Sequence, residues 1–177
     1  IGTIPFKGQV LNGMARYWFE RSQSIAANHL ISMPDPAVSV VEECEVLKVE
    51  MIVRAFLAGS SPTSICTAYE PGARVYCGHQ LPDGLRKNQR LPEPLITPTT
   101  KGEHGAHDEL LSVNEVVKQG LVTEDQWQTM CTLSLKMFAL GTAVASERGL
   151  ILVDTKYEFG LRGDGTLIFI DEIHTPD

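Results

Sequence analysis

The order of apolar and polar residues changes character along the chain, and each change predicts a different structure. Apolar residues recur at helical spacing from about residue 12, and again in a longer stretch from residue 124 to about residue 148. Residues 38–58 are instead rich in β-branched residues and predict two strands joined by a tight link. Between residues 69 and 98, Pro and Gly interrupt every periodicity, which predicts irregular structure of a kind that is often functional or mobile.

Short sequence signals mark where the helices begin and end. Ser112 with Glu115, and Thr123 with Gln126, match the capping box that opens a helix. The second box opens the long helix, which Gly149 is expected to close, and prolines near residue 34 are expected to break the first helix. One stripe of the long helix predicts core packing rather than a cofactor site; it comprises Trp127, Met130 or Cys131, Ser134, Met137 or Phe138, Gly141, and Val144 or Ala145.

The last 28 residues predict a β-hairpin. The apolar run 150–153 is typical of a buried strand, residues 166–170 form a second β-rich run, and Asp164-Gly165 between them is a strong hairpin signal. With these two residues as the loop, stepping outward places Glu158 opposite Asp171. Because side chains alternate along a strand, Asp154, Lys156 and Glu158 should share one face.

Two carboxylates that face each other across a hairpin favour a bound cation. Like charges in this position are destabilising unless something neutralises them. Oxygen ligands favour Mg²⁺ or Mn²⁺, and a Mg²⁺ held by one or two carboxylates usually completes its shell with water and substrate phosphates. Lys156, between two acids, would suit a phosphate or carboxylate contact. An exposed hairpin face with mixed charges is the alternative interpretation.

Two further polar groups lie along the chain. Alternation places Glu50 and Arg54 on one strand face, either as a surface pair or as the polar wall of a cleft. The Gly59-Ser60 turn that follows could offer backbone N–H groups and a hydroxyl to an anion, or could be an ordinary turn. Hydroxyls, a Lys, an Asp and two His gather in residues 97–108, where a polar ligand loop is favoured over a metal site and a solvated loop is equally compatible.

Composition narrows the function classes. A net charge of -7 argues against a general nucleic-acid or membrane-surface binder, and 43% hydrophobic residues are typical of a soluble domain. The four cysteines form no CxxC pair, so free thiols and a cytoplasmic location are expected. We identify no apolar stretch near the length of a membrane span and no signal peptide. Both ends look cut through structure, which predicts part of a longer protein.

Six segments together carry a family resemblance. They lie at residues 4–8, 49–60, 91–101, 107–108, 153–160 and 171–177, and they include RxxxAGS at residues 54–60 and DxKxEFG at residues 154–160. In this order, over nearly the whole chain, they resemble the phosphoribosylaminoimidazole-succinocarboxamide synthases, or SAICAR synthetases, of purine biosynthesis. The pattern departs from the family at Lys48, where a Pro is usual.

The resemblance implies an α+β fold with mostly antiparallel sheets and a cleft similar to those of ATP-grasp proteins and kinases. It implies one catalytic-domain fragment over residues 1–177, with strands at 38–60 flanking the cleft, a substrate loop at 61–111, and helices and a metal-binding hairpin at 112–177. The implied activity is an ATP- and Mg²⁺-dependent carbon–nitrogen ligase. It would join 4-carboxy-5-aminoimidazole ribonucleotide to L-aspartate through an acyl phosphate.

The resemblance also assigns expected roles to single residues. Glu158 and Asp171 would hold Mg²⁺ and, with Glu50, the nucleotide. Asp154 and Lys156 would be the catalytic residues that orient substrate and phosphate. The residues expected to contact the ribonucleotide are Arg54, Ser60, Lys101 and Asp108.

The family pattern extends beyond both ends of this sequence. Members begin with a β-rich lobe that covers the ATP phosphates and continue into a Ser-Ser-Arg segment and helices, so this chain would carry only part of the ATP site. Whether it is active alone is left open, as is its oligomeric state. Small-molecule partners, without nucleic acid or membrane, are expected. The alternatives are a non-catalytic nucleotide-binding or assembly module and another Mg²⁺-dependent phosphotransferase.

Overall fold

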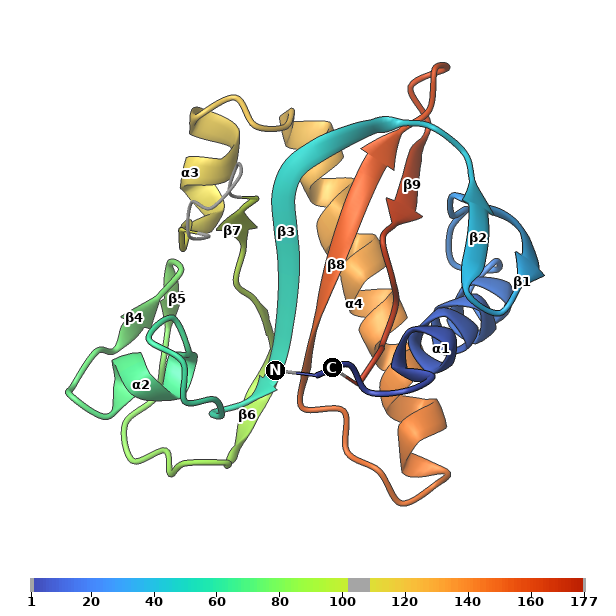
Figure 1. The fold of residues 1–177 in the computed structure, drawn as a ribbon. Helices are drawn as coiled ribbons and strands as arrows, with labels where there is room; N and C mark the ends of the chain where they lie inside the picture. Colours follow the sequence, from blue (N-terminus) through green and yellow to red (C-terminus); the bar gives the residue numbers. More distant parts are fainter. Residues whose placement is uncertain (1, 102–108, 177) are drawn as a thin grey trace. The chain divides into compact units, whose positions relative to one another are not determined.

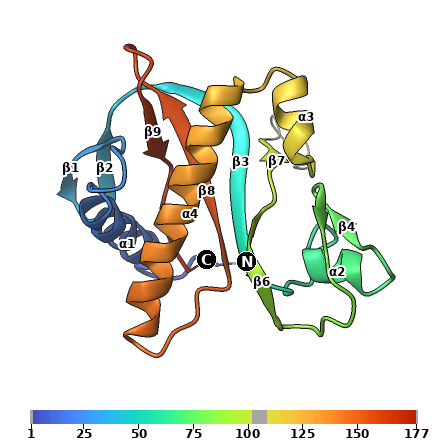
Figure 2. The same ribbon diagram turned by 180° about the vertical axis from the view of Figure 1, so that it is seen from behind.

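The computed structural model describes residues 2–101 and 109–176 and divides the chain into two compact units. Unit 1 comprises residues 1–47 and 157–177, and unit 2 comprises residues 48–156. Strands β3 (Glu45–Phe56) and β8 (Asp154–Leu161) each have residues in both units. Helices and antiparallel strand pairs occur together (Figures 1 and 2), so the predicted α+β class is confirmed.

Unit 1 begins with a helix and a β-hairpin. Helix α1 (Lys7–Arg21) buries Ala15, Trp18 and Phe19 and lies next to strand β1 (Leu30–Asp35), as both views in Figures 1 and 2 show. Strand β2 (Val38–Val41) pairs antiparallel with β1. The helix ends well before the Pro-rich stretch near residue 34. That stretch instead forms the turn of the hairpin, where Asp35 Oδ1 accepts a hydrogen bond of 2.8 Å from Ala37 N.

The C-terminal hairpin exists, but its register differs from the predicted one by one residue. Strand β9 (Leu167–Ile170) pairs antiparallel with β8 and places Glu158 opposite Ile170 rather than opposite Asp171. The difference arises because the loop has three residues, 163–165, closed by a hydrogen bond of 2.9 Å from Arg162 N to Thr166 O. Gly165 takes φ 82°, the left-handed conformation typical of three-residue hairpin loops.

The expected buried strand at residues 150–153 is not formed, and β8 begins only at Asp154. The chain there is still completing the end of helix α4 (Glu124–Ser146). Gly149 takes φ 69°, and Leu150 N donates to Ala145 O at 3.0 Å, which are features of a glycine helix cap. Leu150 and Ile151 are consequently exposed, at 64% and 71%.

Unit 2 contains most of β3 and its partners β6 (Arg90–Ile96) and β7 (Thr99–Thr100), both antiparallel to it. The predicted alternation on β3 is confirmed on its apolar face, where Val49, Met51 and Val53 are fully buried. The pairing places Glu50 opposite Thr99 and Arg54 opposite Leu95. Glu50 and Arg54 of β3 therefore lie beside Thr99 and Thr97, which follow β6 in the sequence.

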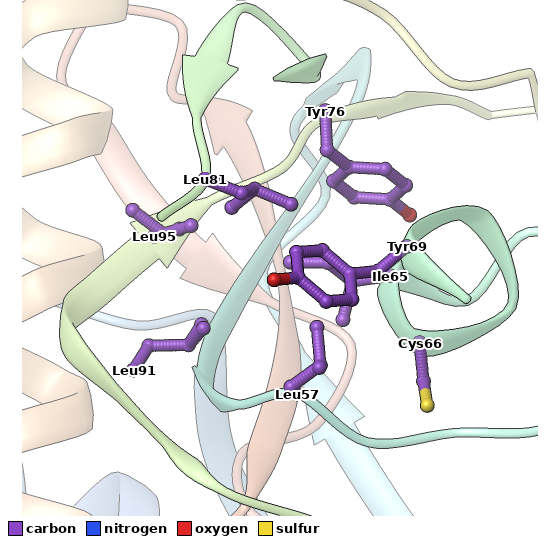
Figure 3. Close-up of a cluster of buried hydrophobic side chains, with 8 residues drawn as sticks. All are labelled: Leu57, Ile65, Cys66, Tyr69, Tyr76, Leu81, Leu91 and Leu95. Atoms are coloured by element: carbon purple, nitrogen blue, oxygen red, sulfur yellow. The ribbon is translucent and has the colours of Figure 1, made fainter. Parts of the chain in front are cut away.

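The Pro- and Gly-rich part of unit 2 is more ordered than its composition predicted. Helix α2 (Ile65–Tyr69) leads into it, and it contains the short pair β4 (Val75–Tyr76) and β5 (His79–Gln80) as well as β6. Eight buried side chains pack into a small core of their own (Figure 3); they are Leu57, Ile65, Cys66, Tyr69, Tyr76, Leu81, Leu91 and Leu95. This local apolar core orders the stretch together with its strands.

Both predicted capping boxes are confirmed, at Ser112 before helix α3 (Val113–Lys118) and at Thr123 before α4. The predicted stripe of α4 is buried through Trp127, Met130, Ser134, Met137, Phe138, Gly141 and Val144. Contrary to the sequence-based expectation, α4 is long and apolar enough to cross a membrane by length and composition. Core helices of water-soluble proteins share this property, and the buried stripe is of that kind.

Candidate active site

Arg54, near the end of β3, is fixed by two neighbours within unit 2. Its Nε donates to Thr97 Oγ1 at 3.1 Å, and its Nη1 donates to Asp154 Oδ2 at 3.0 Å. A backbone hydrogen bond of 3.0 Å from Ala55 N to Val153 O brings the start of β8 to this position. The guanidinium is mostly buried, with 11% of the side chain exposed, so its planar donor fork is held in one orientation.

Tyr76 of the small core and Cys77, which packs against that core, lie close to the same guanidinium. Burial raises the pKa of Tyr76 to about 12, although Arg54 opposes the shift by its charge and by a hydrogen bond to the hydroxyl. Tyr76 also donates to the carbonyl of Thr63. Burial raises the pKa of Cys77 to about 11, so this thiol stays protonated at neutral pH and is a poor nucleophile.

Glu50 forms a second buried polar contact on β3, also within unit 2. Glu50 is 7% exposed, and each oxygen of its carboxylate accepts a hydrogen bond. Thr99 Oγ1 donates to Oε2 at 3.0 Å, and Lys156 Nζ donates to Oε1 at 3.2 Å. The Lys156 side chain is 40% exposed, so its ammonium group is held in place by Glu50 and still accessible to a ligand.

The two acids predicted to hold a cation belong to unit 1. Glu158 is 2% exposed on β8, and Asp171 is an exposed residue with φ 64° directly after β9. They are not partners in the strand ladder. His29 hydrogen-bonds the backbone of Asp171; burial lowers the pKa of His29, and the charge of Asp171 opposes that shift.

Glu158 and Asp171 suit a metal ion that arrives bound to a phosphate-bearing ligand, rather than a metal ion held by protein side chains alone. Among residues 2–101 and 109–176, no group of three or more His, Cys, Asp or Glu side chains is arranged to hold a metal ion. Mg²⁺ commonly needs only one or two carboxylates when phosphates and water complete its shell. Glu158 and Asp171 are oxygen donors of that kind, so the residues present fit Mg²⁺ delivered with a nucleotide.

The remaining predicted residues lie on loops or outside the described residues. Ser60 is exposed just after Gly59, which has φ 100° and leaves no room for a side chain, because a Cβ would lie 2.6 Å from Ser64 Cβ. Lys101 is exposed and its backbone N donates to Lys48 O at 3.3 Å. Asp108 lies outside the described residues, as do His104 and His107.

Unit 2 therefore presents two cationic side chains: Arg54, held by a threonine hydroxyl and a carboxylate, and Lys156, held by a carboxylate that also accepts from Thr99. Such an arrangement can bind and orient phosphate or carboxylate groups. The sequence had shown hydroxyl-rich residues near Lys101 but had not assigned Thr97 or Thr99 to particular partners. Tyr76 was not anticipated at all, because nothing in its Pro- and Gly-rich surroundings distinguishes it.

Comparison with known proteins gives one family. The family model described as SAICAR synthetase matches residues 1–177. A phosphoribosylaminoimidazole-succinocarboxamide synthase of Legionella pneumophila (strain Paris) is 48% identical over 177 residues, which are 100% of this chain and 56% of the relative. The chloroplastic synthase of Vigna aconitifolia is also 48% identical, over 100% of this chain and 51% of the relative.

Solved structures agree with the sequence comparison. The structure described as SAICAR-synthase from Saccharomyces cerevisiae complexed with SAICAR is 28% identical, with a TM-score of 0.85, and the match covers 99% of this chain and 62% of that one. This chain spans about half the length of the two curated relatives.

Proposed function

The chain belongs to the SAICAR synthetase family, and from this premise we propose that the protein carrying it is an ATP- and Mg²⁺-dependent ligase. It joins the carboxylate of 4-carboxy-5-aminoimidazole ribonucleotide to the amine of L-aspartate, forming an amide in purine biosynthesis. The observation that carries the proposal is the match of the family model to all 177 residues. The two oriented cations of unit 2 support it, since both substrates and the nucleotide are anionic.

The chemistry explains why oriented cations are needed. A carboxylate is a poor acyl donor, so ATP first phosphorylates it, and the aspartate amine then displaces phosphate from the acyl phosphate. Phosphoryl transfer depends on positioning and on neutralising oxygen charge more than on covalent help from the protein. A low-dielectric surrounding strengthens such neutralisation, and Glu50 and Arg54 are 7% and 9% exposed.

Each cation has a proposed task in this reaction. Arg54 binds a phosphate or carboxylate of the ribonucleotide, because its hydrogen bonds to Thr97, Asp154 and the Tyr76 hydroxyl do not use all five of its N–H donors. Ser60, Lys101 and Asp108 contribute to the same pocket. Lys156, backed by Glu50, neutralises and orients the phosphoryl group during transfer, and Asp154 orients the substrate through its contact with Arg54.

Glu158 and Asp171 are the proposed ligands of Mg²⁺. When bound, Mg²⁺ would neutralise phosphate oxygens of ATP during transfer. The protein would act in the cytoplasm on small molecules, in line with its net charge of -7 and free cysteines.

The proposal is tested by measuring ADP release by the full-length protein that carries this sequence. ADP should appear only when the ribonucleotide, L-aspartate, ATP and Mg²⁺ are all present, and mass spectrometry should detect the succinocarboxamide product. Glu158→Gln should lower kcat at least about 100-fold, because it removes an anionic ligand proposed to hold Mg²⁺ at the phosphates. Asp164→Asn, at the exposed tip of the same hairpin, is the matched control and should leave kcat unchanged.

Two other results would contradict the proposal in different ways. ADP release that does not require aspartate would indicate a phosphotransferase. Nucleotide binding without any turnover, unaffected in its affinity by Glu158→Gln, would indicate a binding or assembly module.

A further inference from the structure

The turn that follows β9 has an unusual backbone. Asp171 has φ 64° and His174 has φ 49°, both in the left-handed region. Asp and His tolerate this region better than most residues, yet it remains uncommon outside glycine. Ile173 between them is fully buried. A turn of this kind persists only when surrounding contacts hold it.

His174 makes the most directional of these contacts. Its Nε2 lies 2.6 Å from the hydroxyl of Tyr157, and its ring packs edge-on against Trp18 at a centroid distance of 4.5 Å. Burial lowers the pKa of His174 to about 4, so the imidazole is neutral at pH 7. Burial also raises the pKa of Tyr157 well above its usual value, so its hydroxyl stays protonated. The contact is therefore a hydrogen bond between two neutral groups.

The position of this hydrogen bond connects the two proposed metal ligands. Tyr157 directly precedes Glu158 on β8, and His174 follows Asp171 by three residues. The strand ladder ends where Glu158 faces Ile170, so Asp171 lies just beyond the last pair. Its position depends on contacts outside the ladder. His29 supplies one at the Asp171 backbone, and the His174–Tyr157 pair supplies another at the far end of the turn.

We infer that His174 is a positioning residue: through the Tyr157 hydroxyl it fixes the turn that presents Asp171, and so sets where the Asp171 carboxylate lies relative to Glu158 for one divalent cation. The inference rests on the proposed function, because it takes these two acids as cation ligands. His174 itself does not touch the cation. Its effect should appear as weaker cation binding when the hydrogen bond to Tyr157 is removed.

The test measures Mn²⁺ binding to the full-length protein, with saturating ATP, from the relaxation rate of water protons, which distinguishes Mn²⁺ held at the protein from Mn²⁺ bound by ATP in solution. Tyr157→Phe deletes only the hydroxyl and should raise the Kd for Mn²⁺ about fivefold, the usual effect of one hydrogen bond. His174→Leu should raise it at least as much. His174→Gln, whose amide can still reach the hydroxyl, should stay within about twofold of wild type.

A second buried tyrosine provides the matched control. Tyr69 donates to Pro82 O at 2.7 Å and accepts from Leu85 N at 3.0 Å, all within unit 2. Tyr69→Phe therefore also loses a buried hydroxyl with protein partners, but it should leave the Kd for Mn²⁺ unchanged. A general loss of stability would affect both tyrosine variants, whereas loss of positioning affects only Tyr157→Phe.

The outcomes separate this inference from the proposed function. If Glu158→Gln weakens Mn²⁺ binding while Tyr157→Phe and His174→Leu bind as wild type does, His174 has no positioning role. If wild type binds no Mn²⁺, or Glu158→Gln binds it normally, the proposed cation ligands are wrong and the inference is overturned with them.

Discussion

Lys156 Nζ lies 3.2 Å from Oε1 of Glu50, a carboxylate whose other oxygen accepts a hydrogen bond from Thr99. The two residues are separated by 106 positions in sequence, so folding alone brings them together. Glu50 thus restricts the flexible lysine side chain to one region. Its role as a nucleotide contact stays a prediction, while its contact with Lys156 is present in the structure.

Glu50→Gln should reduce activity through Lys156. The amide can still accept from Thr99 but no longer attracts the ammonium group, so Lys156 becomes less well placed and kcat should fall about 10- to 100-fold. Unfolding free energy should fall by only about 1 kcal/mol, because Lys156 is 40% exposed and solvent screens the pair. Steady-state kinetics and urea unfolding check both values.

The control for this variant is Glu20→Gln, which breaks the exposed Arg16–Glu20 pair within α1. It should change neither kcat nor stability measurably. Equal loss of activity in Glu20→Gln and Glu50→Gln would show that the loss does not come from the contact between Glu50 and Lys156.

Thr97→Val should weaken ribonucleotide binding. Thr97 is fully buried, and removing its hydroxyl leaves Nε of Arg54 without the acceptor it has at 3.1 Å. An unsatisfied buried donor costs about 1–3 kcal/mol, so KM for the ribonucleotide should rise about tenfold with a smaller change in kcat. Thr100→Val removes a nearby hydroxyl that accepts from Glu109 N instead, and it should leave KM unchanged. A KM equal to that of wild type in Thr97→Val would contradict the role given to Arg54.

Gly160→Ala should destabilise the protein. A Cβ at this position would lie 2.5 Å from Cys44 Sγ and 3.2 Å from the carbonyl oxygen of Glu45. Overpacking of this kind costs about 1–3 kcal/mol, measurable as a lower midpoint of urea unfolding. The Cys44→Ala and Gly160→Ala double variant should recover part of the loss. Gly163→Ala, where a Cβ would meet no atom within 4 Å, should be close to neutral.

Protein stability should decrease as the pH falls below about 6.5. The pKa of His174 is about 4 in the folded protein, against a usual 6.5, so between these values the unfolded chain binds a proton that the folded protein does not. The unfolding free energy contributed by His174 is thus present above pH 6.5 and lost toward pH 4, by about 3 kcal/mol in total. Urea unfolding from pH 4.5 to 7.5 measures this loss.

His174→Gln removes the titrating group and provides the comparison. Its stability should depend less steeply on pH than that of wild type in the same interval. His29, whose pKa is also lowered, retains its own contribution in both proteins. Parallel curves for the two proteins would contradict a buried neutral His174.

Local signals in the sequence predicted local structure well. The capping boxes at Ser112 and Thr123 each involve residues three positions apart, and both form as expected. The buried stripe of α4 and the alternation along β3 follow from helical and strand periodicity in the same way. By contrast, Asp154 lies 100 residues from Arg54 in sequence, and no local pattern could identify it as the partner of that guanidinium.

The hairpin register shows a second limit of the sequence. Asp164-Gly165 suits a two-residue loop, but a Gly in the left-handed conformation also suits the third position of a three-residue loop. The structure has the latter, which moves every pair by one residue and takes Asp171 out of the ladder. A geometric argument that depended on Asp171 facing Glu158 was therefore wrong, while the assignment of both as cation ligands stays a prediction.

The small core between Leu57 and Leu95 has a consequence for how the chain folds. All eight of its side chains come from one continuous stretch, so closing it requires only short loops. Contacts such as the ion pair of Glu42 with Arg162 join residues 120 positions apart and carry a larger entropic cost. This stretch should therefore gain protection from hydrogen exchange early in refolding, before the two arms of the chain that form unit 1 come together.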